Sequence, residues 1–162
     1  MRALAIADTH IPDHARALPD AVLDAARRVD LILHAGDATR AAVLDELGCF
    51  APVHAVMGNN DDPDVAAWGA RETTELDIDG IAIGLIHDAG PTRGRPARMR
   101  RRFPNARIVV FGHSHIPMDL EVEGDGLRLV NPGSPTWKRR EPHPTYAIIQ
   151  FAPTIDIDIR SM

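Results

Sequence analysis

The sequence predicts an α/β protein in which two packed, mixed β-sheets are flanked by helices, an αββα sandwich. Short apolar runs alternate with helical patterns in the first part of the chain, as in strand–helix–strand units. Two turn sequences typical of β-hairpins follow, and the last third is rich in strand patterns. Because the chain has 162 residues, we expect one domain with a single layered architecture rather than two independent cores.

The first part of the chain is expected to form a parallel sheet. The runs at 2–7 and 31–35 are short and apolar, and an acidic residue follows each of them, as at the end of a buried strand. Between them, apolar residues recur at helical spacing from Leu18 to Val29, which predicts a helix. The second unit of this kind contains a predicted helix at 40–47, ended by Gly48, and a strand at 52–57.

After Trp68 the pattern changes, and antiparallel pairing is expected. The pair Asp79-Gly80 favours a tight hairpin between strands at 73–79 and 81–86. A second turn is predicted at Gly124-Asp125-Gly126. The other elements predicted in this part are a helix near 92–103 and strands at 107–111, 118–123, 126–130, 144–151 and 154–160.

Composition excludes several classes of protein. Hydrophobic residues make up 44% and charged residues 25%, which is ordinary for a globular chain and excludes disordered and fibrous classes. No apolar run is long enough for a membrane helix, and Asp8 comes too early for a secretory signal, so we expect a cytoplasmic protein with no membrane partner. The net charge of −5 disfavours nucleic acid as a stable partner. We interpret the basic stretch from Arg93 to Arg102 as a solvated helix surface.

Polar residues of the kinds that bind metals follow the predicted central strands. Carboxylate and amide oxygens and imidazole nitrogens suit Mn, Fe, Zn or Ni, and the lone Cys49 excludes a cysteine cluster. Seven donors are too many for one tetrahedral ion but suit two ions that share a carboxylate, for which Asp37 is the natural bridge. The seven candidate ligands are Asp8, His10, Asp37, Asn59, His87, His113 and His115.

Each of these residues also has a structural explanation when it is taken alone. Asp8 could cap the loop that follows it, His87 could be a core histidine, and His113 could lie at an ordinary strand exit. The ordered series at successive strand ends favours a functional site instead. Glycine precedes Asp37, Asn59 and His113, which would let the backbone turn sharply beside each candidate ligand.

The motifs as a set resemble the calcineurin-like metallophosphoesterases, in particular their small bacterial and archaeal single-domain phosphodiesterases. The resemblance covers nearly the whole chain and implies one metallophosphoesterase domain over residues 1–162. The elements that carry it, in the family's order, are Asp8-Thr9-His10, Gly36-Asp37, Gly58-Asn59-Asn60-Asp61, His87, Gly112-His113-Ser114-His115 and the later loop Asn131-Pro132-Gly133-Ser134.

The resemblance implies a phosphoesterase, and most specifically a phosphodiesterase, that uses a metal-bridging hydroxide to hydrolyse a small phosphate ester. We expect two divalent ions, with manganese preferred and nickel, iron, zinc and magnesium as alternatives. The first ion would be held by Asp8, His10, Asp37 and His115, and the second by Asp37, Asn59, His87 and His113. The candidate catalytic residues are Asp37, Asn59, Asn60 and His113.

Two departures from the family limit what the resemblance implies. Many members have a histidine after the metal-binding asparagine that can protonate the leaving group, whereas this chain has Asn60, and an amide cannot act as a general acid. The Asp-Arg-Gly motif of Ser/Thr protein phosphatases does not follow Gly36-Asp37, which argues against protein phosphatase activity.

Several other polar residues follow the motifs or lie apart from them, and some of these have two interpretations. Asp61 and Asp88 either orient metal-bound imidazoles or are surface carboxylates, and residues 131–134 form either a simple turn or a substrate contact. We expect core-facing side chains for His34 and His54 and surface positions for His14 and His143.

Two other functions compete with the enzyme. A non-catalytic metal-binding scaffold on the same fold is the main alternative, because a retromer subunit that resembles this family serves as a binding platform. A nucleotide-binding regulatory module is disfavoured, since neither G-x-G-x-x-G nor a Walker sequence occurs. The sequence is compatible with a homo-oligomer and does not specify one.

Overall fold

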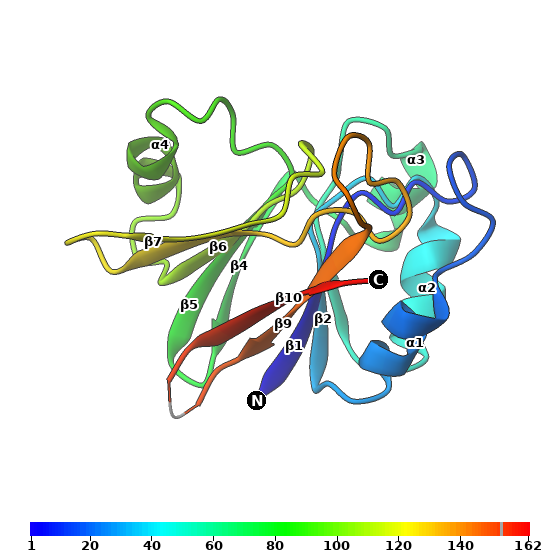
Figure 1. Cartoon of the computed structure of the whole chain (residues 1–162), viewed down its shortest axis with the longest axis horizontal. Helices are drawn as coiled ribbons and strands as arrows, with labels where there is room; N and C mark the ends of the chain where they lie inside the picture. Colours follow the sequence, from blue (N-terminus) through cyan, green and yellow to red (C-terminus); the bar gives the residue numbers. More distant parts are fainter. Residues whose placement is uncertain (153) are drawn as a thin grey trace.

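The computed structural model of the chain describes residues 1–152 and 154–162. Two five-stranded mixed sheets face each other, and helices cover the outer side of each sheet (Figure 1). The predicted α/β sandwich is therefore confirmed. Within the described ranges, none of the helices is both long and apolar enough to cross a membrane.

The first sheet has the strand order β10-β9-β1-β2-β3. Strands β1, β2 and β3 are parallel, as predicted, and β9 runs antiparallel to both of its neighbours. The carboxyl ends of the three parallel strands therefore lie at one edge of this sheet. The bounds are β1 Arg2–Ile6, β2 Leu31–His34, β3 Val53–Ala55, β9 Thr145–Gln150 and β10 Asp156–Ser161.

The second sheet has the order β4-β5-β6-β8-β7, with β5, β6 and β8 parallel. Its hairpins are the two predicted from the turn sequences. Asp79 and Gly80 both have positive φ, 54° and 80°, as a two-residue hairpin with right-handed strand twist requires. The bounds are β4 Thr73–Ile78, β5 Ile81–Ile86, β6 Ile108–Val110, β7 Met118–Val122 and β8 Leu127–Asn131.

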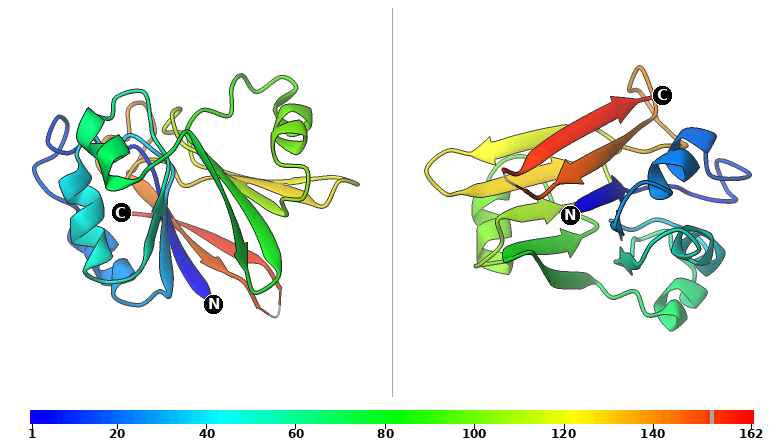
Figure 2. Two further views of the ribbon diagram at one scale, coloured as in Figure 1. Left: turned by 180° about the vertical axis from the view of Figure 1, so that it is seen from behind. Right: turned by 90° about the horizontal axis from the view of Figure 1, so that it is seen from below.

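Three helices pack on the outer face of the first sheet, and one packs on the second sheet (Figure 2). The third helix was not predicted from the sequence, because six residues are too few for a periodic pattern. The signal that could have located it is Pro63 at the first helical position after Asp62. The bounds are α1 Asp20–Ala26, α2 Ala41–Gly48, α3 Pro63–Trp68 and α4 Arg95–Arg102.

Two expectations about helices are corrected. Gly48 does not end its helix in a left-handed conformation; it is the last residue of α2, and Cys49 follows with φ −69°. The basic stretch at α4 is only partly a solvated surface. Arg95 and Arg98 are half-buried and donate to the carbonyls of Gly90 and Ala89 in the preceding loop.

The strand predicted at 52–57 is shorter than expected. Regular pairing covers Val53–Ala55 only; Val56 still donates its backbone N–H to the His34 carbonyl of β2 and forms an isolated bridge with Arg71 on its other side. The chain then enters the loop that carries Gly58 and Asn59. Most other elements are one to three residues shorter at one or both ends than the sequence predicts.

Side-chain alternation along the strands builds three apolar layers. In β1, Leu4 and Ile6 point to the helices, whereas Ala3 and Ala5 point to the second sheet. Small alanines on the inner face allow the two sheets to approach closely, and burying Leu4 or Ile6 contributes about 1.5–3 kcal/mol each. This packing places the loops after β1, β2, β3, β5 and β6 together at one edge of the sandwich.

Candidate metal centre

All seven predicted ligands meet at this edge, and each comes from a loop that follows one of the parallel strands. Asp8 and His10 follow β1, and Asp37 follows β2. Asn59 lies beyond β3, His87 directly follows β5, and His113 and His115 follow β6. Strands from both sheets therefore contribute, so the site lies at the junction of the two sheets rather than at the edge of either one.

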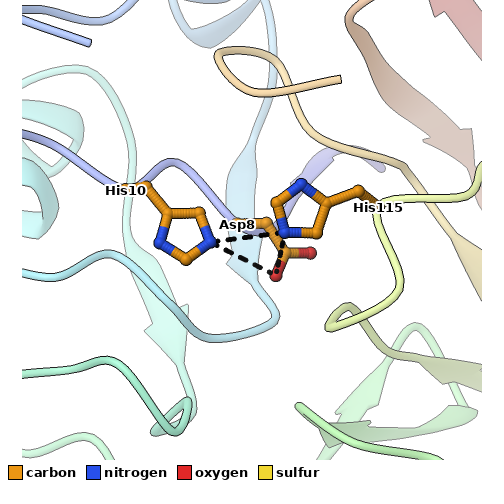
Figure 3. Close-up of side chains that lie close together, drawn as sticks. All are labelled: Asp8, His10 and His115. Atoms are coloured by element: carbon orange, nitrogen blue, oxygen red, sulfur yellow. Dashed lines mark hydrogen bonds and ion pairs between the residues drawn. The ribbon is translucent and has the colours of Figure 1, made fainter. Parts of the chain in front are cut away.

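Asp8, His10 and His115 form one half of the cluster (Figure 3). The Nε2 atom of His115 lies 3.4 Å from Asp8 Oδ1 and 3.3 Å from His10 Nε2. The Nε2 atom of His10 lies 3.9 Å from Asp8 Oδ1. All three residues are buried, with at most 2% of their surface exposed. Three donor atoms thus converge on one point, as metal ligands do.

Asn59, His87 and His113 form the other half together with Asp37. The Oδ1 atom of Asn59 lies 2.9 Å from His113 Nδ1 and 3.2 Å from His87 Nε2. The Nε2 atom of His87 lies 3.4 Å from Asp37 Oδ2. This half is more open, because Asn59 is exposed and His113 is half-buried.

Asp37 connects the two halves. Its Oδ2 atom lies 3.5 Å from His10 Nε2 in one half and 3.4 Å from His87 Nε2 in the other. The side chain is buried. Asp8 is also close enough to group with Asp37 and His87, so the two halves form one continuous set of donors.

The chemistry of the histidines fits bound cations. His115 Nδ1 lies 2.5 Å from the Trp137 carbonyl and His87 Nδ1 lies 2.8 Å from the Ala35 carbonyl, so each Nδ1 carries the proton in the neutral ring. Their Nε2 lone pairs then face other acceptors, on Asp8 for His115 and on Asp37 and Asn59 for His87. Acceptors that face one another at this distance need a proton or a cation between them. In the metal-free protein a proton on His87 Nε2 bridges to Asp37, in agreement with the raised pKa of His87, and a divalent ion would take the place of that proton.

The backbone at five of the seven residues is left-handed, which sequence reasoning did not predict. The φ angles are 55° for Asp8, 45° for His10, 56° for Asp37, 69° for His113 and 61° for His115. Such strain in residues with a Cβ is characteristic of functional sites, where it aims a side chain at a fixed point.

The expectation that glycine turns the chain beside three ligands holds only at Gly36, which has φ 87°. Gly58 and Gly112 do not have positive φ and are required for another reason. A Cβ at Gly58 would lie 2.1 Å from Asp37 Oδ1, and one at Gly112 would lie 2.8 Å from Asp8 Oδ2. The absence of a side chain lets the loops approach the two carboxylates.

Asp61 holds the backbone of the loops that carry Asp37 and Asn59. Its carboxylate accepts hydrogen bonds from the backbone N–H groups of Asp37, Thr39 and Gly58 at 3.2, 2.7 and 2.7 Å. Neither interpretation from the sequence describes this residue fully, because among the described residues Asp61 bonds to backbone N–H groups rather than to an imidazole, and it is half-buried rather than exposed. Asp88 is exposed and accepts from the Gly90 backbone at 2.7 Å, in agreement with its interpretation as a surface carboxylate.

The segment Asn131–Ser134 anchors the loops after β6 and β1. The Asn131 side-chain amide donates to the carbonyl of Gly112, and the Ser134 hydroxyl donates to the carbonyl of Asp8. Both residues are buried, so this segment is a structural support rather than a simple surface turn. Trp137, which sequence reasoning missed, continues the same segment and holds His115 through its carbonyl.

Burial and neighbouring charges shift the pKa values in the centre. Burial raises the pKa of Asp8 to about 7 and lowers that of His115 to about 4. Burial also acts to raise the pKa of Asp37, but hydrogen bonds from His87 and Asn60 outweigh it and hold this pKa below its usual range. Burial acts to lower the pKa of His87, and Asp37 and Asp8 outweigh it and raise this pKa. Asp37 is thus kept as a carboxylate.

The other histidines are not part of the cluster. His34 is buried, as predicted, and its Nε2 atom lies 3.1 Å from the Thr9 hydroxyl. His54 is only half-buried and does not belong to the apolar core. His143 is exposed. His14 is also exposed, but its ring stacks on Trp137 with 3.6 Å between the ring centroids.

Comparison with known proteins identifies the family. The calcineurin-like phosphoesterase superfamily domain matches residues 1–153. The chain belongs to this superfamily. It is 41% identical over 138 residues to a probable metallophosphoesterase of Methanothermobacter thermautotrophicus, an alignment that covers 83% of this chain and 77% of that protein.

Solved structures share the fold of this calcineurin-like phosphoesterase domain. Wild-type Vps29 of Entamoeba histolytica in complex with Zn²⁺ matches with a TM-score of 0.76 and 24% identity, over 99% of each chain. A structure described as a novel archaeal phosphodiesterase matches with a TM-score of 0.77 and 20% identity, over 100% of each chain. Membership of the superfamily implies divalent metal ions, and the cluster of oxygen and nitrogen donors fits them.

Proposed function

We propose that this phosphoesterase is a phosphodiesterase that uses two divalent metal ions to hydrolyse a small phosphate ester. The observation that supports this proposal is the arrangement of seven donor side chains in two groups, with Asp37 facing both. One group would hold the first ion through Asp8, His10, Asp37 and His115. The other would hold the second ion through Asp37, Asn59, His87 and His113.

When bound, two divalent ions polarise phosphoryl oxygens and supply a water-derived nucleophile at neutral pH. We propose manganese as the bound metal, with nickel, iron, zinc and magnesium as alternatives for this mixed set of oxygen and nitrogen donors. The protein's own contribution is to hold the donors in place.

Hydrogen bonds orient the proposed ligands. The His113 backbone N–H donates to Asp8 Oδ1 and Oδ2 at 3.1 and 3.0 Å, which fixes the carboxylate plane. The backbone and side-chain N–H groups of Asn60 donate to the two oxygens of Asp37 at 2.8 and 2.7 Å. Asn60 therefore acts as a positioning residue for the shared carboxylate.

The surroundings of His113 support a diester as substrate. Two cavities border this residue, of about 270 and 310 Å³, and both are lined by His113 and Asp88. The smaller cavity extends towards Arg95, and the larger one extends towards Met57 and Ile86. A phosphodiester carries two substituents and can place one in each cavity, whereas a monoester fills only one.

The nature of Asn60 supports a preference for good leaving groups. Its amide cannot protonate a departing oxygen, and one of its two side-chain N–H groups is bonded to Asp37. Aryl esters such as nitrophenyl esters leave as stable anions and need no proton. Activated aryl phosphodiesters are therefore the preferred test substrates.

Hydrolysis assays with metal analysis test the proposal. Metal-free protein is loaded with Mn²⁺, Ni²⁺, Mg²⁺ or Zn²⁺ and assayed with p-nitrophenyl phosphate, bis(p-nitrophenyl) phosphate and cyclic nucleotides. We expect about two ions per chain, faster hydrolysis of the diester than of the monoester, and loss of both metal and activity in Asp37→Asn. His143→Gln, at an exposed position, is the control variant.

The alternative function is a non-catalytic metal-binding scaffold. The structural likeness to Vps29 with bound Zn²⁺ favours it, since that protein carries metal on the same fold. The same experiment separates the two functions. Two bound ions with no hydrolysis of any phosphate ester would support the scaffold and contradict the enzyme.

A further inference from the structure

The smaller cavity beside His113 contains an arginine that the proposed chemistry does not use. Arg95 lines this cavity together with Asp88, Phe111, His113 and Ser114. It is the first residue of α4, the helix that packs on the outer face of the second sheet. The cavity therefore joins α4 to the edge of the candidate metal centre.

The side chain of Arg95 is held in one position. Its Nε and Nη2 atoms donate to the carbonyl of Gly90 at 3.1 and 2.7 Å, and its guanidinium carbon lies 5.0 Å from the centre of the Phe111 ring. Because the Gly90 carbonyl takes the Nε edge of the planar guanidinium, the edge formed by Nη1 and Nη2 keeps N–H groups for another partner. The contact that Nη1 makes is a weak one, 3.9 Å from the sulfur of Met118.

The positive charge of Arg95 lacks a carboxylate partner in the part of the chain that the structure describes. Two other half-buried arginines are paired, Arg100 with Asp125 and Arg128 with Asp119, whereas Arg98, within the described ranges, bonds only to backbone carbonyls and does not line the cavity. No ion pair within 4.0 Å involves Arg95 among the described residues, although Asp88 lines the same cavity. Burial and the charge of Arg98 lower the pKa of Arg95, while Asp88 acts to raise it. An anion in the cavity would therefore be stabilised by this arginine.

We propose that Arg95 binds an anionic group, a phosphate or a carboxylate, on one arm of the phosphodiester substrate. Arg95 would then determine specificity without taking part in the chemical step. This inference rests on the proposed function, because it takes His113 as part of the reaction centre and the cavity as the site of one ester arm. A planar guanidinium edge suits the paired oxygens of a phosphate or carboxylate.

A purely structural role is the competing explanation. Arg95 could serve only to fasten the loop at Gly90, as Arg98 fastens the same loop through the carbonyls of Ala89 and Pro91. Arg98 does not line the cavity. Arg98→Met is therefore a matched control, since it removes loop contacts made from the same helix and takes no side chain out of the cavity lining.

Two substrates that differ by one remote phosphate test the proposal. Thymidine 3′-(p-nitrophenyl phosphate) and its 5′-phosphorylated form share the scissile bond and the leaving group. We expect the wild-type protein to prefer the phosphorylated form by about tenfold in kcat/KM, the size of one charge-assisted contact. In Arg95→Met this ratio should fall to about one, Arg95→Lys should retain part of it, and Arg98→Met should retain all of it. A wild-type ratio near one, or a ratio unchanged in Arg95→Met, would overturn the proposal.

A binding measurement separates failure of this inference from failure of the proposed function. If the metal-loaded protein hydrolyses neither substrate, the phosphodiesterase is contradicted, and Arg95 is then tested by calorimetry. Thymidine 3′,5′-bisphosphate should bind about tenfold more tightly than thymidine 3′-phosphate, and Arg95→Met should abolish the difference. Equal affinities in the wild-type protein would overturn the role of Arg95. Thermal melting of each variant verifies that it is folded.

Discussion

The side-chain amide of Asn60 donates a 2.7 Å hydrogen bond to Oδ2 of Asp37, the oxygen that also faces His10 and His87. A residue at the position where many relatives carry a proton donor is thus used here to orient the shared carboxylate. The amide can hold Asp37 in place, but it has no proton to give to a leaving group. This relationship connects the geometry of the centre to its expected preference among substrates.

The first prediction concerns Asn60→His. An imidazole that reaches the leaving oxygen can protonate it, so turnover of alkyl phosphodiesters should rise relative to aryl ones, by about tenfold or more. Plots of log kcat/KM against leaving-group pKa should be flatter for Asn60→His than for the wild-type protein. Asn60→Ala, which removes the amide and adds no acid, is the control. Parallel plots for wild type and Asn60→His would show that position 60 does not control protonation.

The second prediction separates the two halves of the centre. His115→Ala removes a donor beside Asp8 and His10, whereas His113→Ala removes one beside Asn59 and His87. Each variant should retain about one ion per chain instead of about two, and Asp37→Asn should weaken both positions, because its carboxylate faces both. Metal content after dialysis measures the number of ions that each variant retains, and competition with a chelator measures the affinity of each position. Equal loss of both ions from the two histidine variants would contradict two separable positions.

The third prediction concerns Asp61, which holds three backbone N–H groups of the ligand loops. Asp61→Asn replaces one acceptor oxygen by a donor and leaves at least one of these N–H groups without a partner. We expect metal affinity to fall about 10–100-fold and the free energy of unfolding to fall by about 1–3 kcal/mol. Asp62→Asn, at a neighbouring residue that pairs with Arg40 on the surface, should change both quantities little. Similar effects for the two variants would refute the role assigned to Asp61.

The fourth prediction compares two glycines. A Cβ at Gly58 would overlap Asp37 Oδ1, so Gly58→Ala should displace the carboxylate and lower metal binding at both positions. Gly48 lies in α2 without positive φ, and a Cβ added to it would meet none of the described residues within 4 Å, so Gly48→Ala should stabilise the protein. The gain is expected to be about 0.5–1 kcal/mol. Thermal melting and metal titration of both variants measure these effects, and normal metal binding by Gly58→Ala would contradict the close packing.

The fifth prediction is a pH dependence of stability caused by His34. Burial lowers the pKa of this histidine to about 3 in the folded protein, against a usual value of 6.5. Below pH 6.5 the unfolded chain therefore binds a proton that the folded protein does not, and stability falls with decreasing pH until about pH 3. The contribution is about 1.4 kcal/mol per pH unit in this range.

Denaturation of metal-free protein between pH 7 and pH 4 measures this effect. The free energy of unfolding of His34→Gln should depend less steeply on pH than that of the wild-type protein, because glutamine does not titrate. His143→Gln, at an exposed position, should keep the wild-type slope. If the free energy of unfolding depended on pH equally steeply in wild type and in His34→Gln, the pKa of His34 would not be lowered in the folded protein.

The sequence alone was sufficient to predict the sandwich and the seven residues that meet in the centre. Apolar runs and hairpin turns such as Asp79-Gly80 are local signals, and they predict which segments form strands and which consecutive strands form hairpins. Parallel strands bring their carboxyl ends to one edge, so polar residues directly after β1, β2 and β3 were bound to approach one another.

Only the tertiary structure decided how these residues are held. Asp61 bonds to the backbone of Asp37, 24 positions away in the chain, and His115 bonds to Trp137, 22 positions away. Arg95 meets His113 in a cavity formed where α4 packs on the second sheet. Such partners depend on the relative placement of loops that approach one another only after the sheets have packed. A residue's own neighbours in the sequence carry information about its strand, its turn and its buried face, but not about the group that a distant loop brings to it.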